Sequence, residues 1–273
     1  MRQTKSNWGW WFLVFLWIPL GTLPAQQITL MQLLSLEKNG SYTISRPNVA
    51  LMHFNPKDEW YLTGLKPYSV RTLSQLSVGG RMSAFFRSSA SVDLHYFGYD
   101  TWRYWHCRVA VARTLTPVLQ GGITLSYLQS GITGERFIPR ANVSAHLALR
   151  VKAHLYITSS LENLWPSSSK AGISPSSQLI IRAYYWLNDR LGGMAGMSLN
   201  RRGRYEAVAG LGLQKKGSGL SFVVYPISGR FGFGLQQKTI RHLYLQLSAE
   251  RHPLLGNTLS GGIIWRKERG REK

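Results

Sequence analysis

A turn that recurs at constant spacing is the feature that most limits what this chain can fold into. The segment Leu115–Leu119 reads LTPVL, and the segments Val151–Leu155 and Leu187–Leu191 repeat its apolar ends. The first residues of the three segments are 36 positions apart each time. Around all three, the larger apolar residues fall mostly on odd positions, which predicts strands with one apolar and one polar face.

Each of these segments is expected to be a hairpin with a three-residue loop. Pro117 fixes its own φ and has no backbone N–H to donate, so a strand is expected to end there. Pairing Leu115 with Leu119 keeps the apolar residues of both arms on one face. A period of 36 residues then holds two strands of about ten residues, a short turn and a longer loop. This is the repeating unit of a transmembrane β-barrel, although a soluble antiparallel barrel or sandwich also alternates.

The first 25 residues favour the membrane alternative. Arg2 and Lys5 precede an apolar run from Trp8 to Leu20, and the segment Gly21–Ala25 follows it and ends on a small residue before the polar Gln26. The pattern predicts a cleaved signal peptide over residues 1–25, with a retained N-terminal anchor as the alternative. No later run is long and apolar enough to predict a membrane-spanning helix. An exported chain with many alternating strands is therefore expected to be a barrel in the outer membrane.

The predicted fold class is all-β, an antiparallel transmembrane β-barrel of about fourteen strands with a short, partly helical N-terminal lead-in. The lead-in spans residues 26–57 and is a possible plug, the barrel spans residues 58–265, and a basic tail spans residues 266–273. An even number of strands would place both ends of the barrel on the periplasmic side, with the short turns. The expected strands are 58–66, 72–86, 90–98, 103–115, 119–130, 140–151, 155–163, 177–187, 191–200, 204–213, 219–227, 230–238, 241–250 and 257–265.

The chain is strongly basic, with 33 basic and 12 acidic residues and a net charge of +21. Arg108, Arg150, Arg182 and Arg204 lie on even positions, opposite the apolar face, so we expect them to line the lumen or its rims. Nucleic-acid binding is the alternative for such a charge, but the basic residues are scattered and no nucleic-acid motif occurs. We therefore expect outer-membrane lipid and lipopolysaccharide as the partners of the basic rims, and no nucleic acid.

Residues 54–163 resemble a family of outer-membrane barrels of Bacteroidetes, that of PorV and PorQ. The segments that carry the resemblance are Phe54-Asn55-Pro56, Leu73–Leu76, Phe97–Arg103, Ala110–Arg113, Leu115–Leu119, Gly122–Tyr127 and Leu161–Asn163. Members of this family are similar in fold to the FadL fatty-acid transporters and have an Asn-Pro motif before the first strands. The resemblance implies a fourteen-strand barrel and makes Phe54, Asn55 and Pro56 a candidate plug motif. The family usually continues this motif with Ala-Gly-Leu, whereas Lys57, Asp58 and Glu59 follow it here.

The sequence contains no motif of an enzyme or a metal site. It has no Gly-x-Ser-x-Gly, His-Glu-x-x-His, His-x-His or Cys-x-x-Cys spacing and no glycine-rich phosphate loop. We expect no catalytic, cofactor-binding or metal-binding residues and no enzymatic activity. The family resemblance makes a component of type IX secretion or surface-protein export the main expectation, with secretion subunits as possible partners. The alternative is a FadL-like or porin-like channel for small or hydrophobic solutes.

Overall fold

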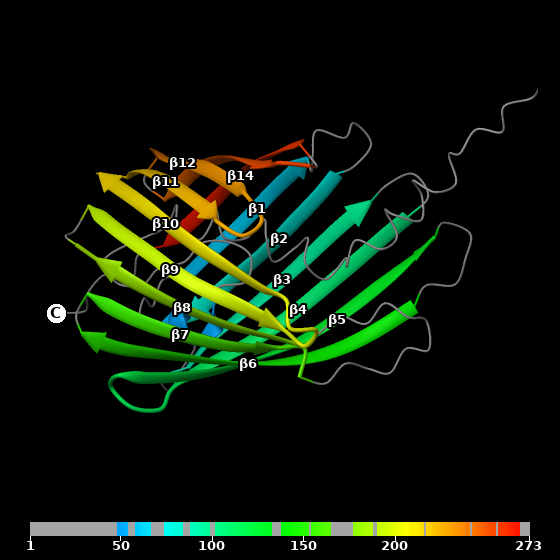
Figure 1. Cartoon of the computed structure of the whole chain (residues 1–273), viewed down its shortest axis with the longest axis horizontal. Coiled ribbons are helices and arrows are strands. Elements are labelled where there is room, and N and C mark those ends of the chain that lie inside the picture. Colours follow the sequence, from blue (N-terminus) through cyan, green and yellow to red (C-terminus); the bar gives the residue numbers. More distant parts are fainter. Residues whose placement is uncertain are drawn as a thin grey trace, which may run out of the picture.

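Fourteen antiparallel strands close into a single barrel in the computed structural model (Figure 1). The structure describes residues 48–53, 58–66, 74–83, 88–98, 102–132, 138–152, 154–164, 177–187, 190–215, 217–240, 242–254 and 256–267. The strands are β1 (Asp58–Lys66), β2 (Ser74–Ser83), β3 (Ser88–Gly98), β4 (Trp102–Thr114), β5 (Leu119–Ile132), β6 (Ile138–Lys152), β7 (Leu155–Glu162), β8 (Gln178–Trp186), β9 (Leu191–Asn200), β10 (Tyr205–Lys215), β11 (Ser218–Tyr225), β12 (Arg230–Ile240), β13 (Leu243–His252) and β14 (Gly256–Lys267). The predicted antiparallel β-barrel and its fourteen strands are confirmed, whereas most of the predicted partly helical lead-in lies outside the described residues.

Each strand pairs with its neighbours in sequence, and β1 also pairs with β14 to close the ring. Asp58, the first residue of β1, lies opposite Lys267, the last residue of β14. We call this end of the barrel, where the turn between β4 and β5 also lies, the turn end. The opposite end, which carries the connection between β5 and β6, is called the loop end. Both ends of the barrel sequence thus lie at the turn end, as the even number of strands predicts.

The outward face of the barrel is apolar and the inward face is largely polar. Val109 and Val111 of β4 are about half exposed on the outside. Arg108, which directly precedes Val109, points inward and is only 6% exposed. The same alternation places Leu147 outward and His146 inward on β6. Ile181 and Leu245, also on odd positions, are exposed as well, as the odd parity of their strands predicts.

The odd parity does not hold throughout the chain. In β1, β2 and β3 the outward apolar residues are on even positions, for example Leu62, Val78 and Leu94. The parity changes where β3 pairs with β4, because Gly98 lies opposite Arg103 and joins an even position to an odd one. It changes again on both sides of β11, so that the inward residues of this strand are also odd.

Two of the three predicted hairpins have the expected geometry. The backbone N–H of Leu115 donates to the carbonyl of Leu119 at 3.0 Å, and that of Leu187 donates to the carbonyl of Leu191 at 2.9 Å. The middle hairpin is different, since Lys152 pairs with Leu155 and the register shifts after Arg150. The prediction of three equivalent loops is therefore wrong for this hairpin, where a β-bulge takes up one residue.

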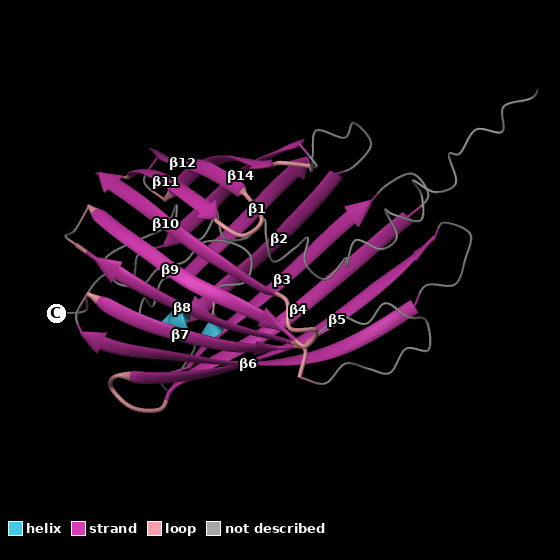
Figure 2. Cartoon of the chain, in the orientation of Figure 1, coloured by secondary structure: helices cyan, strands magenta, loops and turns pink. Residues whose placement is uncertain are grey.

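A short helix of the lead-in lies inside the barrel. The 3₁₀-helix η1 (Val49–His53) packs against the inner face of β4, β5 and β6, and Figure 2 shows it near the turn end. The candidate plug motif Phe54-Asn55-Pro56 lies outside the described residues, as does the predicted signal peptide. Arg266 and Lys267, which were predicted to begin the basic tail, belong to β14. In the part of the chain that the structure describes, no helix is long and apolar enough to cross a membrane.

An arginine on the outward face should distinguish a lipid-embedded barrel from a soluble one. We expect Val109→Arg, in the middle of β4, to lower the free energy of unfolding in lipid vesicles by about 2–4 kcal/mol. Leu115→Arg, at the turn end, should cost only about 0–1 kcal/mol, because the side chain reaches the interface. Urea titration followed by tryptophan fluorescence measures both. Equal costs at the two positions would contradict a membrane belt around the middle of the strands.

Candidate functional site: the barrel interior

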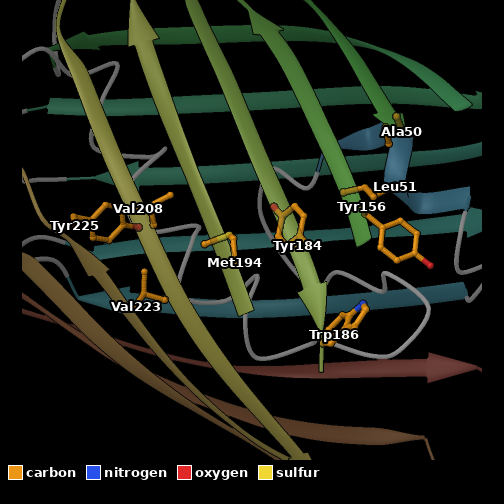
Figure 3. Close-up of a cluster of buried hydrophobic side chains, with 10 residues drawn as sticks. Ala50, Leu51, Tyr156, Tyr184, Trp186, Met194, Val208, Val223 and Tyr225 are labelled. Carbon is orange, nitrogen blue, oxygen red and sulfur yellow. The ribbon is translucent and has the colours of Figure 1, made fainter. Parts of the chain in front are cut away.

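The interior has an apolar wall that begins at η1 and runs across the strands to β11 (Figure 3). Its residues are Ala50, Leu51, Ala148, Tyr156, Tyr184, Trp186, Met194, Val208, Val223 and Tyr225, all buried. On the strands they occupy inward positions, between the outward residues that form the apolar belt. Tyr156 and Trp186 lie near the turn end and Tyr225 near the loop end, so this wall extends over most of the length of the interior.

Hydrogen bonds from Asn48 hold η1 against the barrel. The side-chain amide nitrogen of Asn48 lies 2.8 Å from the carbonyl oxygen of Leu147 and 2.9 Å from that of Ser159, which are on β6 and β7. The same nitrogen is 3.1 Å from the hydroxyl of Ser160, and the amide oxygen accepts from the backbone N–H of Ala50. Asn48 thereby links the helix to two strands and caps its first turn.

Small inward residues make room for η1 on the wall of β4, β5 and β6. A Cβ atom at Gly122 would lie 3.1 Å from Val49 Cγ1 and 3.2 Å from the backbone nitrogen of Ala50. Ala110 and Ala112 of β4 are each 1% exposed and form a buried cluster with Val49. Larger side chains at these inward positions would occupy the place of the helix.

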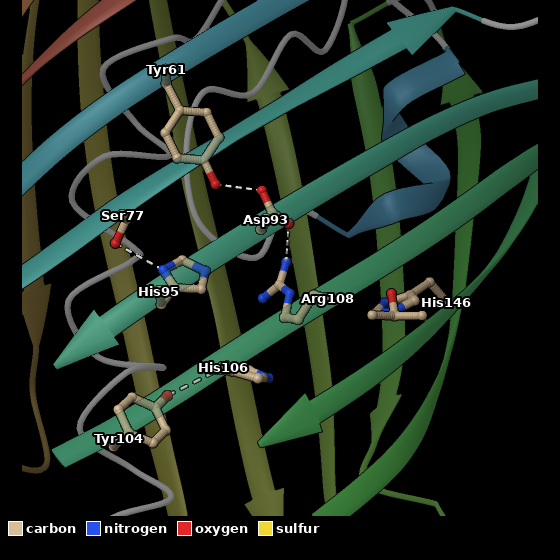
Figure 4. Close-up of polar contacts among 9 residues, drawn as sticks. Tyr61, Ser77, Asp93, His95, Tyr104, His106, Arg108 and His146 are labelled. Atoms are coloured by element: carbon tan, nitrogen blue, oxygen red, sulfur yellow. Dashed lines mark hydrogen bonds and ion pairs between the residues drawn. The ribbon is translucent and has the colours of Figure 1, made fainter. Parts of the chain in front are cut away.

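On the side of β4 that faces β3, away from most of η1, the buried carboxylate of Asp93 has two hydrogen-bond partners (Figure 4). The hydroxyl of Tyr61 on β1 donates to Asp93 Oδ1 on β3, and Arg108 on β4 donates to Asp93 Oδ2 at 3.1 Å. Asp93 and Arg108 are directly opposite in the register of β3 and β4. Burial weakens solvent screening, so this contact neutralises Arg108 inside the barrel.

The inward histidines take part in hydrogen bonds with neighbouring strands. His95 Nδ1 lies 2.8 Å from the hydroxyl of Ser77, and Figure 4 shows both side chains beside Asp93. His146 lies between the hydroxyls of Thr124 at 2.9 Å and Ser160 at 3.0 Å. Among the described residues, no group of three histidine, cysteine or acidic side chains could hold a metal ion. The histidines thus connect neighbouring strands by hydrogen bonds within the polar part of the interior.

Two further arginine clusters lie at opposite ends of the interior. At the turn end, Glu59 Oε2 accepts from Arg266 at 2.9 Å and lies 3.4 Å from Arg81. At the loop end, Arg230 contacts Glu206 at 2.8 Å and Glu250 at 3.0 Å. The guanidinium of Arg230 also lies over the ring of Tyr225, 4.0 Å from its centroid.

The odd parity of the apolar residues does not predict these arginines as inward residues. Arg81 is on an odd position of β2, where the parity is reversed, and Arg266 belongs to β14 although it lies in the predicted tail. The signal for Arg81 is nevertheless present, because Leu76 and Val78 alternate on the even positions of its strand. Arg230 is on an even position and could have been found by the same argument as Arg108.

The four arginines predicted to line the lumen or its rims do not form one group. Arg108 is buried on β4, and Arg182 is half-buried on the inward face of β8. Arg150 is exposed at the turn end and donates to the carbonyl of Pro117 at 3.2 Å. Arg204 is exposed in the turn between β9 and β10, at the loop end. Among the buried residues that the structure describes, five arginines face three acidic residues, a net charge of +2.

No known protein family and no curated protein matches this sequence. Among solved structures, the barrel is similar to the CymD monoaromatic hydrocarbon channel, with a TM-score of 0.60 and 8% identity over 83% of this chain and 92% of that chain. It is also similar to the Acinetobacter baumannii outer membrane protein Omp33, with a TM-score of 0.51 and 11% identity over 78% of this chain and 100% of that chain. The chain has the fold of an outer-membrane channel. The comparisons do not extend this likeness to PorV and PorQ or to an origin in Bacteroidetes.

Removing one partner of the central ion pair should destabilise the barrel more than removing both. Arg108→Met leaves Asp93 buried with only Tyr61, so we expect the free energy of unfolding to fall by about 3–5 kcal/mol. The double variant Asp93→Asn with Arg108→Met should recover much of this loss, because no buried charge remains. Urea unfolding in lipid vesicles of four proteins, the parent, the two single variants Arg108→Met and Asp93→Asn, and the double variant, measures these differences. Additive effects of the two substitutions would show that the two side chains do not interact.

Proposed function

We propose that this protein is a passive channel for small solutes in the outer membrane of a bacterium. The observation that carries the proposal is a closed fourteen-strand barrel whose outward face is apolar and whose interior is lined by hydrogen-bonding and charged side chains. In lipid, a closed barrel satisfies its backbone hydrogen bonds while its interior remains available to polar solutes. The turn end would face the periplasm, as in other bacterial barrels with short periplasmic turns.

The inward side chains support a narrow pathway. Arg108, Arg230, Arg266 and Gln246 are inward residues and are each no more than 6% exposed, and η1 occupies part of the turn end. Such an interior favours slow passage of small molecules over a wide water-filled pore. In this proposal the protein is a channel and not an enzyme, and contacts of its exposed arginines with anionic lipid remain a prediction. A role in type IX secretion receives no support from the comparisons, and for this reason the channel is preferred.

Conductance in planar lipid bilayers tests the channel directly. We expect small, discrete current steps in KCl and a weak preference for anions, because the buried described residues carry a net charge of only +2. Liposome swelling in solutions of uncharged solutes should show the same pathway without an electric field. If the folded barrel passes neither ions nor small solutes, the channel proposal is wrong and a component of a larger machine becomes the better explanation.

Loosening η1 should widen the pathway. Asn48→Ala removes the hydrogen bonds from the side chain of Asn48 to β6 and β7, and Gly122→Leu places a side chain where Val49 and Ala50 now lie. We expect both variants to raise the single-channel conductance or the open probability, because each displaces the helix from the wall. Asn257→Ala, an exposed substitution on β14 at the loop end, is the matched control and should leave the currents unchanged. Unaltered currents in both η1 variants would mean that the helix does not obstruct the pathway.

A further inference from the structure

Three inward polar side chains on neighbouring strands have atoms without a hydrogen-bonding partner. They are Ser221 on β11, Gln236 on β12 and Gln246 on β13, with exposed fractions of 6%, 3% and 1%. The hydroxyl oxygen of Ser221, the amide nitrogen of Gln236 and both amide atoms of Gln246 make no hydrogen bond in the described structure. We call these three residues the amide cluster.

The strand register explains why the barrel itself does not satisfy the amide cluster. Gln236 lies opposite Gln246 on one side and Gly219 on the other. Ser221 lies between Gly212 and Gly234, and Gln246 has Gly262 as its second neighbour. Glycine offers no side chain, so these positions bring the three polar groups together without supplying partners for them.

Buried polar groups in proteins nearly always have a hydrogen-bond partner. Four buried atoms on three adjacent strands thus have no partner among the described residues, and water or a solute can supply one. Gln246 is the most informative residue, because its donor and its acceptor both lack a partner, so exchanging the two amide atoms would not change the conclusion.

The chemistry of the amide cluster selects an uncharged partner. Ser221 can donate and accept, the Gln236 nitrogen donates, and Gln246 does both. An anion would satisfy only the donors and a cation only the acceptors, whereas hydroxyl groups satisfy both kinds. Toward the loop end, the charge of Arg230 is neutralised by Glu206 and Glu250. Toward the turn end, the ammonium nitrogen of Lys238 lies 5.9 Å from the ring centroid of Tyr244. None of the three residues of the amide cluster carries a charge.

We propose that the amide cluster is a binding site for an uncharged solute rich in hydroxyl groups, such as a polyol or a small sugar. The inference rests on the proposed channel function, since it names the class of solute that the channel would take. Val223 lies on the same inward face of β11, two residues beyond Ser221, and gives the site an apolar border. A sugar combines hydroxyl edges with apolar C–H faces and so matches both surfaces.

Equilibrium dialysis of the folded protein in detergent micelles tests the site with three probes that share one carbon skeleton. The probes are labelled glucose, its anionic oxidation product gluconate, and cationic glucosamine. We expect glucose to bind with the highest affinity. Gln246→Leu and Gln236→Leu should each weaken glucose binding by about 2- to 10-fold, the effect of losing one or two hydrogen bonds. Gln237→Leu is the matched control, because Gln237 is the next residue on β12 but is exposed on the outward face.

Thermal unfolding adds a second readout. Leucine in place of Gln246 removes unpartnered buried atoms, so this variant should unfold at an equal or higher temperature than the parent protein while it binds less glucose. Equal or tighter binding of gluconate or glucosamine, or glucose binding that is unchanged in both inward variants, would overturn the proposal. Absence of glucose binding would overturn it too and would leave water as the partner of the amide cluster. Binding is measured without transport, so this result is independent of whether the bilayer experiment detects a channel.

Discussion

The pairing of β1 with β14 is the constraint on which the rest of the structure depends. A sheet with free edges would expose backbone N–H and C=O groups to lipid, where each unsatisfied group costs several kcal/mol. Nine residues of β1, from Asp58 to Lys66, pair with β14 and remove both edges. Glu59 adds buried side-chain contacts across the same seam, since it binds Arg266 of β14 and Arg81 of β2. The closure thus combines backbone hydrogen bonds with ion pairs that solvent screens little.

Closure also decides where the charges of the strands can lie. The outward face is apolar and, in the proposed outer-membrane location, would contact lipid, so charged residues in the middle of a strand have to point inward, where they need partners. Asp93 with Arg108 and Arg230 with Glu206 and Glu250 meet this requirement. The buried described residues consequently hold only +2 of the formal charge of +21. The large net charge of the sequence is therefore a poor measure of the field inside the barrel.

Much of the fold could be predicted from alternation, and the errors have a common cause. The apolar positions of β4 to β10 identify the outward face, because lipid requires a side chain of this kind at every second residue. The parity of one strand relative to the next depends on the number of residues in the connection, which alternation does not determine. The pairing of Gly98 with Arg103 and the reversed parity of β11 both result from such connections. The inward position of Arg81 follows from the alternation of β2 itself, where Leu76 and Val78 are the outward residues, and not from the parity of β4 to β10.

The candidate site could be predicted less well from the sequence than the fold, because it depends on which residues of neighbouring strands lie opposite each other. Arg108 was predicted to point inward, but its partner Asp93 lies on an odd position in a strand of opposite parity. The place where η1 packs is indicated in the sequence by three small inward residues, Ala110, Ala112 and Gly122. Larger polar residues occupy the neighbouring inward positions. Nothing in the local sequence connects Asn48 to its partners, because Leu147, Ser159 and Ser160 are 99, 111 and 112 residues away along the chain.

The position of η1 has a consequence for the opposite wall. In a ring of fourteen strands, β12 is as far from β5 as two strands can be, and Figure 1 shows them on opposite sides of the barrel. Gly122 and Gln246 are each three residues beyond the first residue of their strands, Leu119 and Leu243, which both start at the turn end. The helix on β4–β6 and the amide cluster on β11–β13 therefore face each other at a similar depth. In the proposed channel, a solute beside the helix would lie across the barrel from the amide cluster, so the element that would narrow the pathway would also favour contact with this cluster.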